Sequence, residues 1–209
     1  MRTPTSVTTL ESLGRVQLSK SFLMREFLYS EISQIEGIRN IPDNPDLAIE
    51  VGKRLCEDVL EPIQDKFGRI SIRSAYRSSA VNGRGAENEN GCAKNESNFS
   101  RHIWDKTLKD EKGAMACVVL TPYIPYFERT GDWEALAWWI HDNIPAYSEL
   151  EFFTKSRELL AFNIGWHKTP KKTIHAWAPR LKCLTKPGME NHSGNHKEQY
   201  AAWLAACEA

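Results

Sequence analysis

The chain has 209 residues, enough to fill one hydrophobic core, so a single domain with long loops is expected. Its 27 Lys and Arg balance its 27 Asp and Glu, which leaves no overall charge to attract nucleic acid or an anionic membrane. The 41% hydrophobic content excludes a disordered chain, and no apolar run approaches the roughly 18 residues of a membrane span. The first twenty residues lack the apolar stretch of a signal peptide, so we expect a protein that is cytoplasmic as made. The five cysteines are an odd number at irregular spacings, which favours thiols or ligands over a disulfide framework.

The first half of the chain predicts one long helix and one strand. Residues 1–17 have no clear periodicity and are expected to form a loose lead-in, and residues 21–34 suggest a short helix. The long helix starts at Asn44-Pro45 and ends at Phe67-Gly68, and its apolar residues recur every four positions: Leu47, Val51, Leu55, Val59 and Ile63. Residues 69–74 alternate between polar and apolar side chains, as a strand does. Residues 82–100 are almost entirely polar and predict a long loop.

The second half predicts three strands and two helices. The strands are expected at 114–120, 148–153 and 159–166. One helix should be capped by Asp132 and run through Ile140, and a short helix is expected at 199–206. This order predicts an α+β fold: a single domain with a mainly antiparallel sheet, flanking helices and long loops. We expect the domain to cover residues 18–180 and a C-terminal extension to cover 181–209.

Four residues at or near the ends of predicted strands could carry chemistry. Arg77 follows a strand, where its guanidinium could bind a carboxylate or a developing oxyanion, or simply contact a surface turn. His102 and His167 could each be a metal ligand or a hydrogen-bonded structural residue. Cys117 lies within an apolar strand and could be a ligand or a buried core thiol.

Five short motifs occur in a defined order along the chain. They are Ser74-Ala-Tyr-Arg-Ser78, Asn82, Ser100-Arg-His102, Gly113-Ala-Met-Ala-Cys117 and Trp166-His167. Together they resemble the ordered pattern of the zinc D-Ala-D-Ala carboxypeptidase family, which also includes D,D-dipeptidases and phage endolysin peptidases. The resemblance spans about residues 18 to 180, most of the chain.

The resemblance implies a zinc metallopeptidase with an open coordination position for water. By position, His102, Cys117 and His167 match the three zinc ligands of the family, and Arg77 matches the arginine that stabilises the tetrahedral intermediate. Cys117 stands where the family has Asp. A thiolate can bind zinc, but it makes the ion a weaker Lewis acid.

Two further departures leave alternatives open. The segment between His102 and Gly113 is longer than in the family and contains Asp105 and Asp110, either of which could replace Cys117 as a ligand. The family's catalytic Glu has no direct match. Glu151 is the first candidate for the general base and Glu149 the second, because alternate residues of the strand ending near Phe153 share one face. Both could instead be solvent-facing charges.

The leading hypothesis is therefore a zinc-dependent peptidase-like protein that acts on peptidoglycan stem peptides of the bacterial cell wall. Such a protein could be phage-encoded, and could belong to a virion or be released to the wall. The alternative is a catalytically inactive, zinc-containing module of the same fold that binds peptide or peptidoglycan. A third hypothesis is nucleic-acid binding through the basic residues of segment 168–186, a patch that is more typical of a solvated face. The segment His192 to His196 is expected to be a solvated tail.

Overall fold

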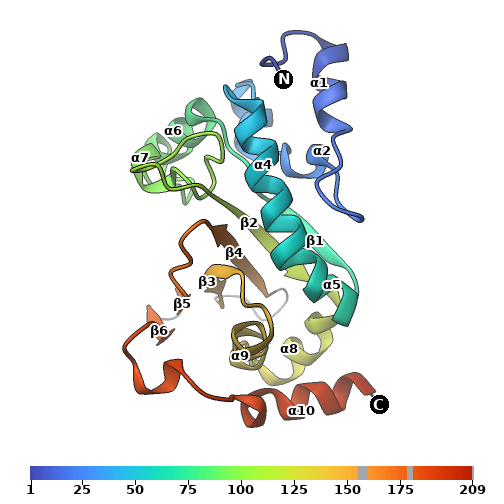
Figure 1. Ribbon diagram of the computed structural model, residues 1–209, viewed down its shortest axis with the longest axis vertical. Coiled ribbons are helices and arrows are strands. Elements are labelled where there is room, and N and C mark those ends of the chain that lie inside the picture. The colour runs from blue at the N-terminus through green and yellow to red at the C-terminus, as the bar shows by residue number, and fades with distance from the viewer. Residues whose placement is uncertain (155–159, 178–180, 209) are drawn as a thin grey trace.

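The computed structural model describes residues 1–154, 160–177 and 181–208 and is built around a six-stranded sheet (Figure 1). The spatial order of the strands is β1-β2-β4-β3-β5-β6, and every neighbouring pair is antiparallel except β3 and β5. The strands are β1 (Ile70–Ser74), β2 (Gly113–Leu120), β3 (Tyr147–Phe153), β4 (Ala161–His167), β5 (Thr173–Ala176) and β6 (Lys182–Thr185). The predicted single-domain α+β fold with a mainly antiparallel sheet is confirmed. Residue 159, where the third predicted strand begins, lies outside the described residues.

Helices flank the sheet and extend beyond both of its ends (Figure 1). They are α1 (Val7–Gly14), α2 (Met24–Phe27), α3 (Glu31–Glu36), α4 (Pro45–Leu55), α5 (Glu61–Phe67), α6 (Ser79–Glu87), α7 (Asn95–Asn98), α8 (Ile124–Thr130), α9 (Glu134–Asn143) and α10 (Lys197–Glu208). A π-helical turn, Cys56–Leu60, joins α4 to α5, so the long predicted helix is present from Pro45 to Phe67. Asn44 caps it, with Oδ1 accepting the Leu47 N–H at 3.2 Å.

The two faces of the sheet differ in chemistry. Alternate residues of the central strands, including Ala116, Leu150 and Phe162, belong to one core cluster with Val51 of α4 and Ile140 of α9. The intervening residues of the same strands point to the other face. That face carries most of the sequence-predicted site residues, namely Cys117, Glu149, Glu151 and His167. Helices thus cover the apolar face and leave the polar face to form pockets.

The polar segment 82–100 is not the long loop that we expected. Most of it belongs to α6 and α7, which the buried Asn82 ties together. The Asn82 Nδ2 donates to Ala93 O and Asn95 Oδ1, both at 2.9 Å, and its Oδ1 accepts from Asn98 Nδ2 at 3.0 Å. The segment lacks apolar residues because amide side chains hold it together by hydrogen bonds.

The N-terminal segment also differs from the expected loose lead-in. It contains α1, which is capped by Ser6 through a hydrogen bond from the Thr9 N–H to Ser6 Oγ at 3.2 Å. Leu13 of this helix is fully buried and belongs to the core. One buried leucine is too little to produce a periodic pattern in the sequence.

The C-terminal region docks on α9 instead of extending into solvent. The buried Trp203 of α10 packs on Phe67, with ring centroids 4.3 Å apart. The His196 ring stacks on Trp138 at 4.1 Å, and its Nδ1 lies 2.7 Å from Asp142 Oδ1. The expected solvated tail at His192 to His196 is therefore wrong, because aromatic and carboxylate groups of α9 hold this segment.

Docking of the C-terminal region should weaken in acid. His141 Nε2 donates to the His192 carbonyl at 2.9 Å, which leaves Nδ1 to accept from the Tyr147 hydroxyl at 2.5 Å. Burial, together with the neighbouring His192 and His196, lowers the pKa of His141. Because the pKa of His141 is lower in the folded protein, its neutral ring stabilises the fold. This stabilisation is fully present above the unfolded-state pKa of about 6.5, and it is lost as the pH falls below that value. We expect NMR to show the His141 ring titrating below pH 6.5, with increased amide exchange in α10 at pH 5. A His141 midpoint at or above 6.5 would contradict this.

Among the described residues, no helix combines the length and the apolar character that crossing a membrane requires.

Candidate functional site: two pockets on the polar face of the sheet

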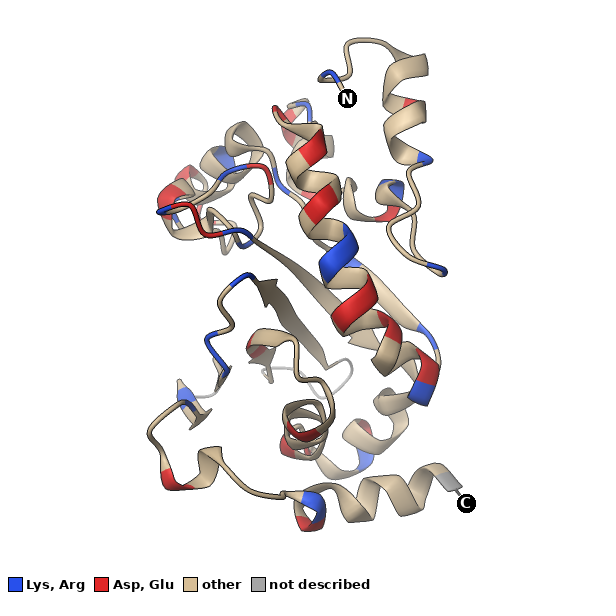
Figure 2. Cartoon of the chain, viewed as in Figure 1, with Lys and Arg blue, Asp and Glu red and all other residues tan. Residues whose placement is uncertain are grey.

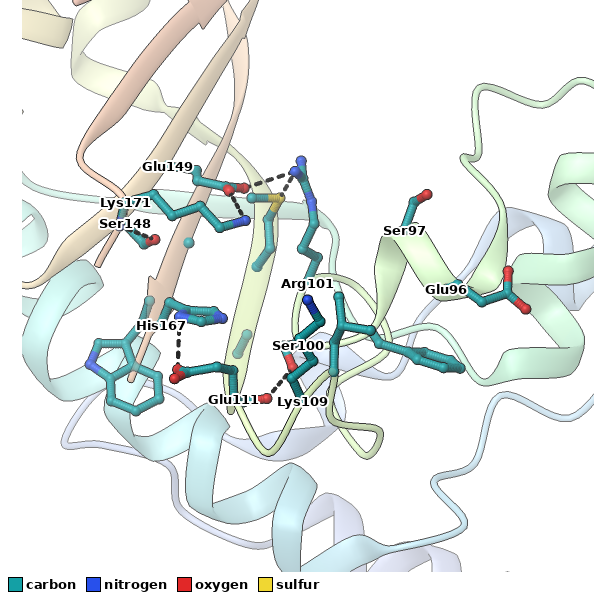
Figure 3. Close-up of a pocket in the computed structure, with 16 residues that line it drawn as sticks. Glu96, Ser97, Ser100, Arg101, Lys109, Glu111, Ser148, Glu149, His167 and Lys171 are labelled. Carbon is teal, nitrogen blue, oxygen red and sulfur yellow. Dashed lines mark hydrogen bonds and ion pairs between the residues drawn. The ribbon is translucent and has the colours of Figure 1, made fainter. Parts of the chain in front are cut away.

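Arg101 lies at the centre of the polar face. It comes from the segment between α7 and β2, and its side chain is 26% exposed. Its Nη1 is 2.8 Å from Glu149 Oε2, and its Nη2 is 2.6 Å from Glu151 Oε1. Burial opposes the guanidinium charge, but the two carboxylates outweigh it and raise the pKa of Arg101. Lys171 Nζ is a second cation on Glu149, at 2.5 Å from Oε1 (Figure 3).

The first pocket, here the His102 pocket, has a volume of about 590 Å³. Its lining includes Arg73, Ser74, Arg77, Cys92, His102, Cys117 and Asn163. His102 is 4% exposed, and its Nδ1 lies 2.8 Å from the carbonyl oxygen of Ala75. The Asn163 side chain lines the same pocket and acts to raise the pKa of this ring. Burial, followed by the nearby charge of Arg77, holds the pKa of His102 well below its usual value, so the ring is neutral.

Cys117 of β2 and Arg77, which follows β1, both line the His102 pocket. Burial raises the pKa of the Cys117 thiol, although Arg73 and Arg77 act in the opposite direction. Arg77 follows β1, and its backbone N–H donates to the His102 carbonyl at 2.8 Å. Its Nη1 contacts Cys92 Sγ, while its buried Nε has no hydrogen-bond partner among the described residues. The structure therefore brings Arg77, His102 and Cys117 to one pocket.

The second pocket, here the His167 pocket, lies on the other side of Arg101 and has a volume of about 280 Å³. Figure 3 shows Glu111, Glu149, His167 and Lys171 around it. His167 Nδ1 is 2.9 Å from Thr169 O and 3.6 Å from Glu111 Oε2. His167 is thus separated from the two residues with which it was expected to share zinc.

The strand register explains this separation. On β4, Asn163 pairs with Cys117 of β2, whereas His167 pairs with Gly113. Cys117 and the position facing His167 are four residues apart, or about 13 Å along the strand. Ligand atoms on one tetrahedral zinc lie within about 4 Å of one another. His102, Cys117 and His167 therefore do not fit one ion. The described part of the chain holds no cluster of three or more His, Cys, Asp or Glu able to bind a metal.

The alternative aspartate ligands lie elsewhere. Asp105 is buried, where its Oδ2 accepts the Asp43 N–H at 2.7 Å and its Oδ1 accepts the Tyr76 hydroxyl at 3.2 Å. It anchors the start of the segment before α4. Asp110 is exposed, at φ 62°. Neither residue lines either pocket.

The two candidate bases share the polar face, but ion pairs occupy both of them. Glu149 contacts Arg101 and Lys171. Glu151 binds Arg101 through one oxygen and accepts from Asn163 Nδ2 at 2.8 Å through the other. Both carboxylates are therefore already engaged by partners on the protein itself.

Sequence reasoning missed Arg101 and Asn163. Arg101 stands between two residues of the Ser100-Arg-His102 motif, so it had a signal in the sequence. Asn163 had none, because it is identified as a site residue only by its pairing with Cys117 and Glu151. The chain matches no known family model, no curated protein and no solved structure.

Proposed function

We propose that the chain is a peptide-binding module that recognises cell-wall stem peptides without hydrolysing them. The supporting observation is the Arg77 Nε, a buried donor without a hydrogen-bond partner in the described structure, beside an open pocket. An unsatisfied buried donor costs about 1–3 kcal/mol, which an acceptor from a ligand would recover. The stem peptide as the ligand class comes from the motif resemblance.

A peptide carboxylate is the acceptor that suits this pocket. Arginine binds carboxylates through parallel N–H donors, and Arg73 lies in the same lining. The lining also holds Glu31 and Glu36, and Glu36 is paired with Arg84. The Asn163 amide and the Ser74 hydroxyl supply uncharged hydrogen-bonding groups. A volume of about 590 Å³ falls in the range of small-molecule sites.

Two features favour binding over hydrolysis. The expected zinc ligands are divided between two pockets, and both candidate bases form ion pairs with Arg101. Zinc-dependent hydrolysis stays a prediction, and the zymogram described below distinguishes it from binding without hydrolysis. A phage-encoded protein of the virion or of lysis is the context that the motif resemblance suggests.

The basic segment 168–186 gives no comparable support to nucleic-acid binding. Lys171 pairs with Glu149, Lys182 pairs with Glu134, and the Lys172 amine lies 4.3 Å from the centre of the Tyr147 ring. Figure 2 shows acidic and basic residues interspersed over the chain. Phosphate binding would have to compete with these internal partners. Arg180 lies outside the described residues.

The substitution Arg77→Lys tests the proposal. We expect it to weaken binding of a stem pentapeptide by about tenfold or more in calorimetry, because Lys keeps the charge but not the paired donors. Arg84→Lys, on the exposed part of α6, is the matched control and should bind as the wild type does. Amidation of the terminal carboxylate of the peptide should have the same effect as Arg77→Lys.

A zymogram on peptidoglycan separates binding from hydrolysis. We expect retention on peptidoglycan without clearing, both with and without a chelator. Clearing that disappears with the chelator would establish the zinc peptidase and overturn the binding module. Absence of any binding to pentapeptide or peptidoglycan would refute both.

A further inference from the structure

We infer that a groove beside the N-terminal helix, here the α1 groove, binds a small amphiphilic anion: an apolar chain that ends in a carboxylate. The groove lies between α1, α2 and the segment 28–41, at the opposite end of the molecule from α10 (Figure 1). Its volume of about 570 Å³ falls in the range of small-molecule sites. Of the described residues, none lines both this groove and a pocket of the polar face, so the inference does not depend on the peptide site proposed above.

One face of α1 presents an apolar wall to the groove. Val7, Leu10 and Gly14 are spaced three and four residues apart, which places them on the same side of the helix, and all three line the groove. Tyr29 and Ile41 belong to the facing wall. Val7 is 84% exposed, Tyr29 54% and Leu10 37%. Exposed apolar side chains gathered around a hollow are typical of a surface that receives a ligand.

The groove also carries positive charge that the protein does not compensate. Arg25 and Arg39 line it, and within the described part of the chain neither guanidinium has a hydrogen bond or an ion pair. The carboxylate in the described lining is that of Glu11, which pairs with Arg15 Nη2 at 2.5 Å. Glu26, next to Arg25 on α2, accepts the N–H at the start of that helix at 2.7 Å. Two guanidinium groups are therefore left to meet a ligand.

The charge of Arg25 lies at one end of the apolar wall. A Cβ added at Gly14, the last residue of α1, would lie 3.2 Å from Arg25 Cβ and 3.7 Å from Arg25 Nε. The Arg25 side chain thus runs beside the final turn of α1, while Leu10 and Val7 lie on the preceding turns. Gly14 and Val7 are about 10 Å apart along the helix axis. A ligand with its carboxylate at Arg25 would lay its apolar chain over Leu10 and Val7.

The uncharged polar groups of the lining are already engaged. The buried Asn40 amide makes three hydrogen bonds to backbone groups, at 2.7 to 2.9 Å, and the Ser33 hydroxyl donates to Ile38 O at 2.6 Å. The arginines repel a cationic amphiphile, and a purely polar anion would leave the apolar walls in water. An apolar carboxylate satisfies both, because arginine binds carboxylates through parallel N–H donors.

Binding of dodecanoate, measured by calorimetry below its micelle concentration, tests the inference. We expect one saturable site per chain, and at least about tenfold weaker binding of octanoate, whose shorter chain buries fewer methylene groups. Amide NMR shifts should change at Leu10 and Tyr29 and stay constant at Arg77 and His102. Such a pattern places the ligand in the α1 groove and not in the His102 pocket.

Substitutions at exposed positions identify the two halves of the site. Arg25→Gln, which removes the charge, and Leu10→Glu, which adds a carboxylate to the apolar wall, should each weaken dodecanoate binding at least about tenfold. Arg129→Gln, at an exposed position of α8, is the matched control and should bind as the wild type does. Circular dichroism verifies that each variant is folded.

Four results would overturn the inference. They are the absence of saturable dodecanoate binding to the folded wild type, equally tight binding of dodecyltrimethylammonium, wild-type affinity in both groove variants, and shift changes at Arg77 and His102 instead of the groove. Retention on phosphatidylglycerol vesicles without a dodecanoate site would identify a membrane-facing surface and would also overturn it. These measurements contain no peptide, so their failure is distinct from failure of the proposed function.

Discussion

Replacement of Arg101 by methionine is expected to lower the free energy of unfolding by about 3 kcal/mol. The side chains of Glu149 and Glu151 are only 10% and 14% exposed, and Arg101 contacts both of them. Methionine fills much of the same volume but, among the residues that the structure describes, leaves Glu151 without a cation and Glu149 with Lys171 alone. Breaking a buried ion pair on one side is costly because the remaining charge stays desolvated.

The control for this substitution is Lys112→Met, which removes an ion pair with Glu50 whose partners are 38% and 54% exposed. Exposed pairs contribute between zero and about 1 kcal/mol, so this variant should unfold almost as the wild type does. Urea unfolding at pH 7 measures both. A loss below about 1 kcal/mol in Arg101→Met would show that the central ion pairs do not stabilise the polar face.

The fold was largely predictable because its strongest signals are local. The four-residue recurrence from Leu47 to Ile63 reflects a helix that buries one face. The apolar run before Leu120 reflects a strand that is buried on both faces. The short helices α6 and α7 could not be predicted in this way. Their stability comes from the side-chain hydrogen bonds of Asn82, which leave no apolar periodicity.

The candidate site was only partly predictable, because the order of motifs along the chain does not fix the register between strands. Arg77, His102 and Cys117 converge because Arg77 follows β1, and because the N–H of Arg77 reaches the carbonyl of His102. His167 matched a motif but lies four residues too far along β4. Asn163 lies opposite Cys117 instead, and only the pairing of β4 with β2 and β3 reveals this.

Gly113 is expected to be among the least replaceable residues of the chain. A Cβ at this position would lie 2.3 Å from the Ser100 carbonyl oxygen and 2.8 Å from His167 Cδ2. The Ser100 carbonyl cannot easily retreat, because Ser100 is held by its N–H to Lys106 O at 3.0 Å and its Oγ to Glu111 O at 2.5 Å. Gly113→Ala must therefore push the segment that carries Arg101 away from β2.

We expect Gly113→Ala to cost about 3 kcal/mol of unfolding free energy, at the upper end for inserting one methyl group into a packed site. Gly83→Ala is the matched control: its Cβ would meet nothing closer than 3.7 Å, and it lies inside α6. Alanine is favoured over glycine in a helix by up to about 1 kcal/mol, so this control should be neutral or stabilising. Urea unfolding gives both values, and NMR shifts of Arg101 and His102 report the displacement. Equal stability of the two variants would mean that the segment before β2 moves without a loss of unfolding free energy. The close approach of Ser100 to Gly113 would then not be what positions Arg101.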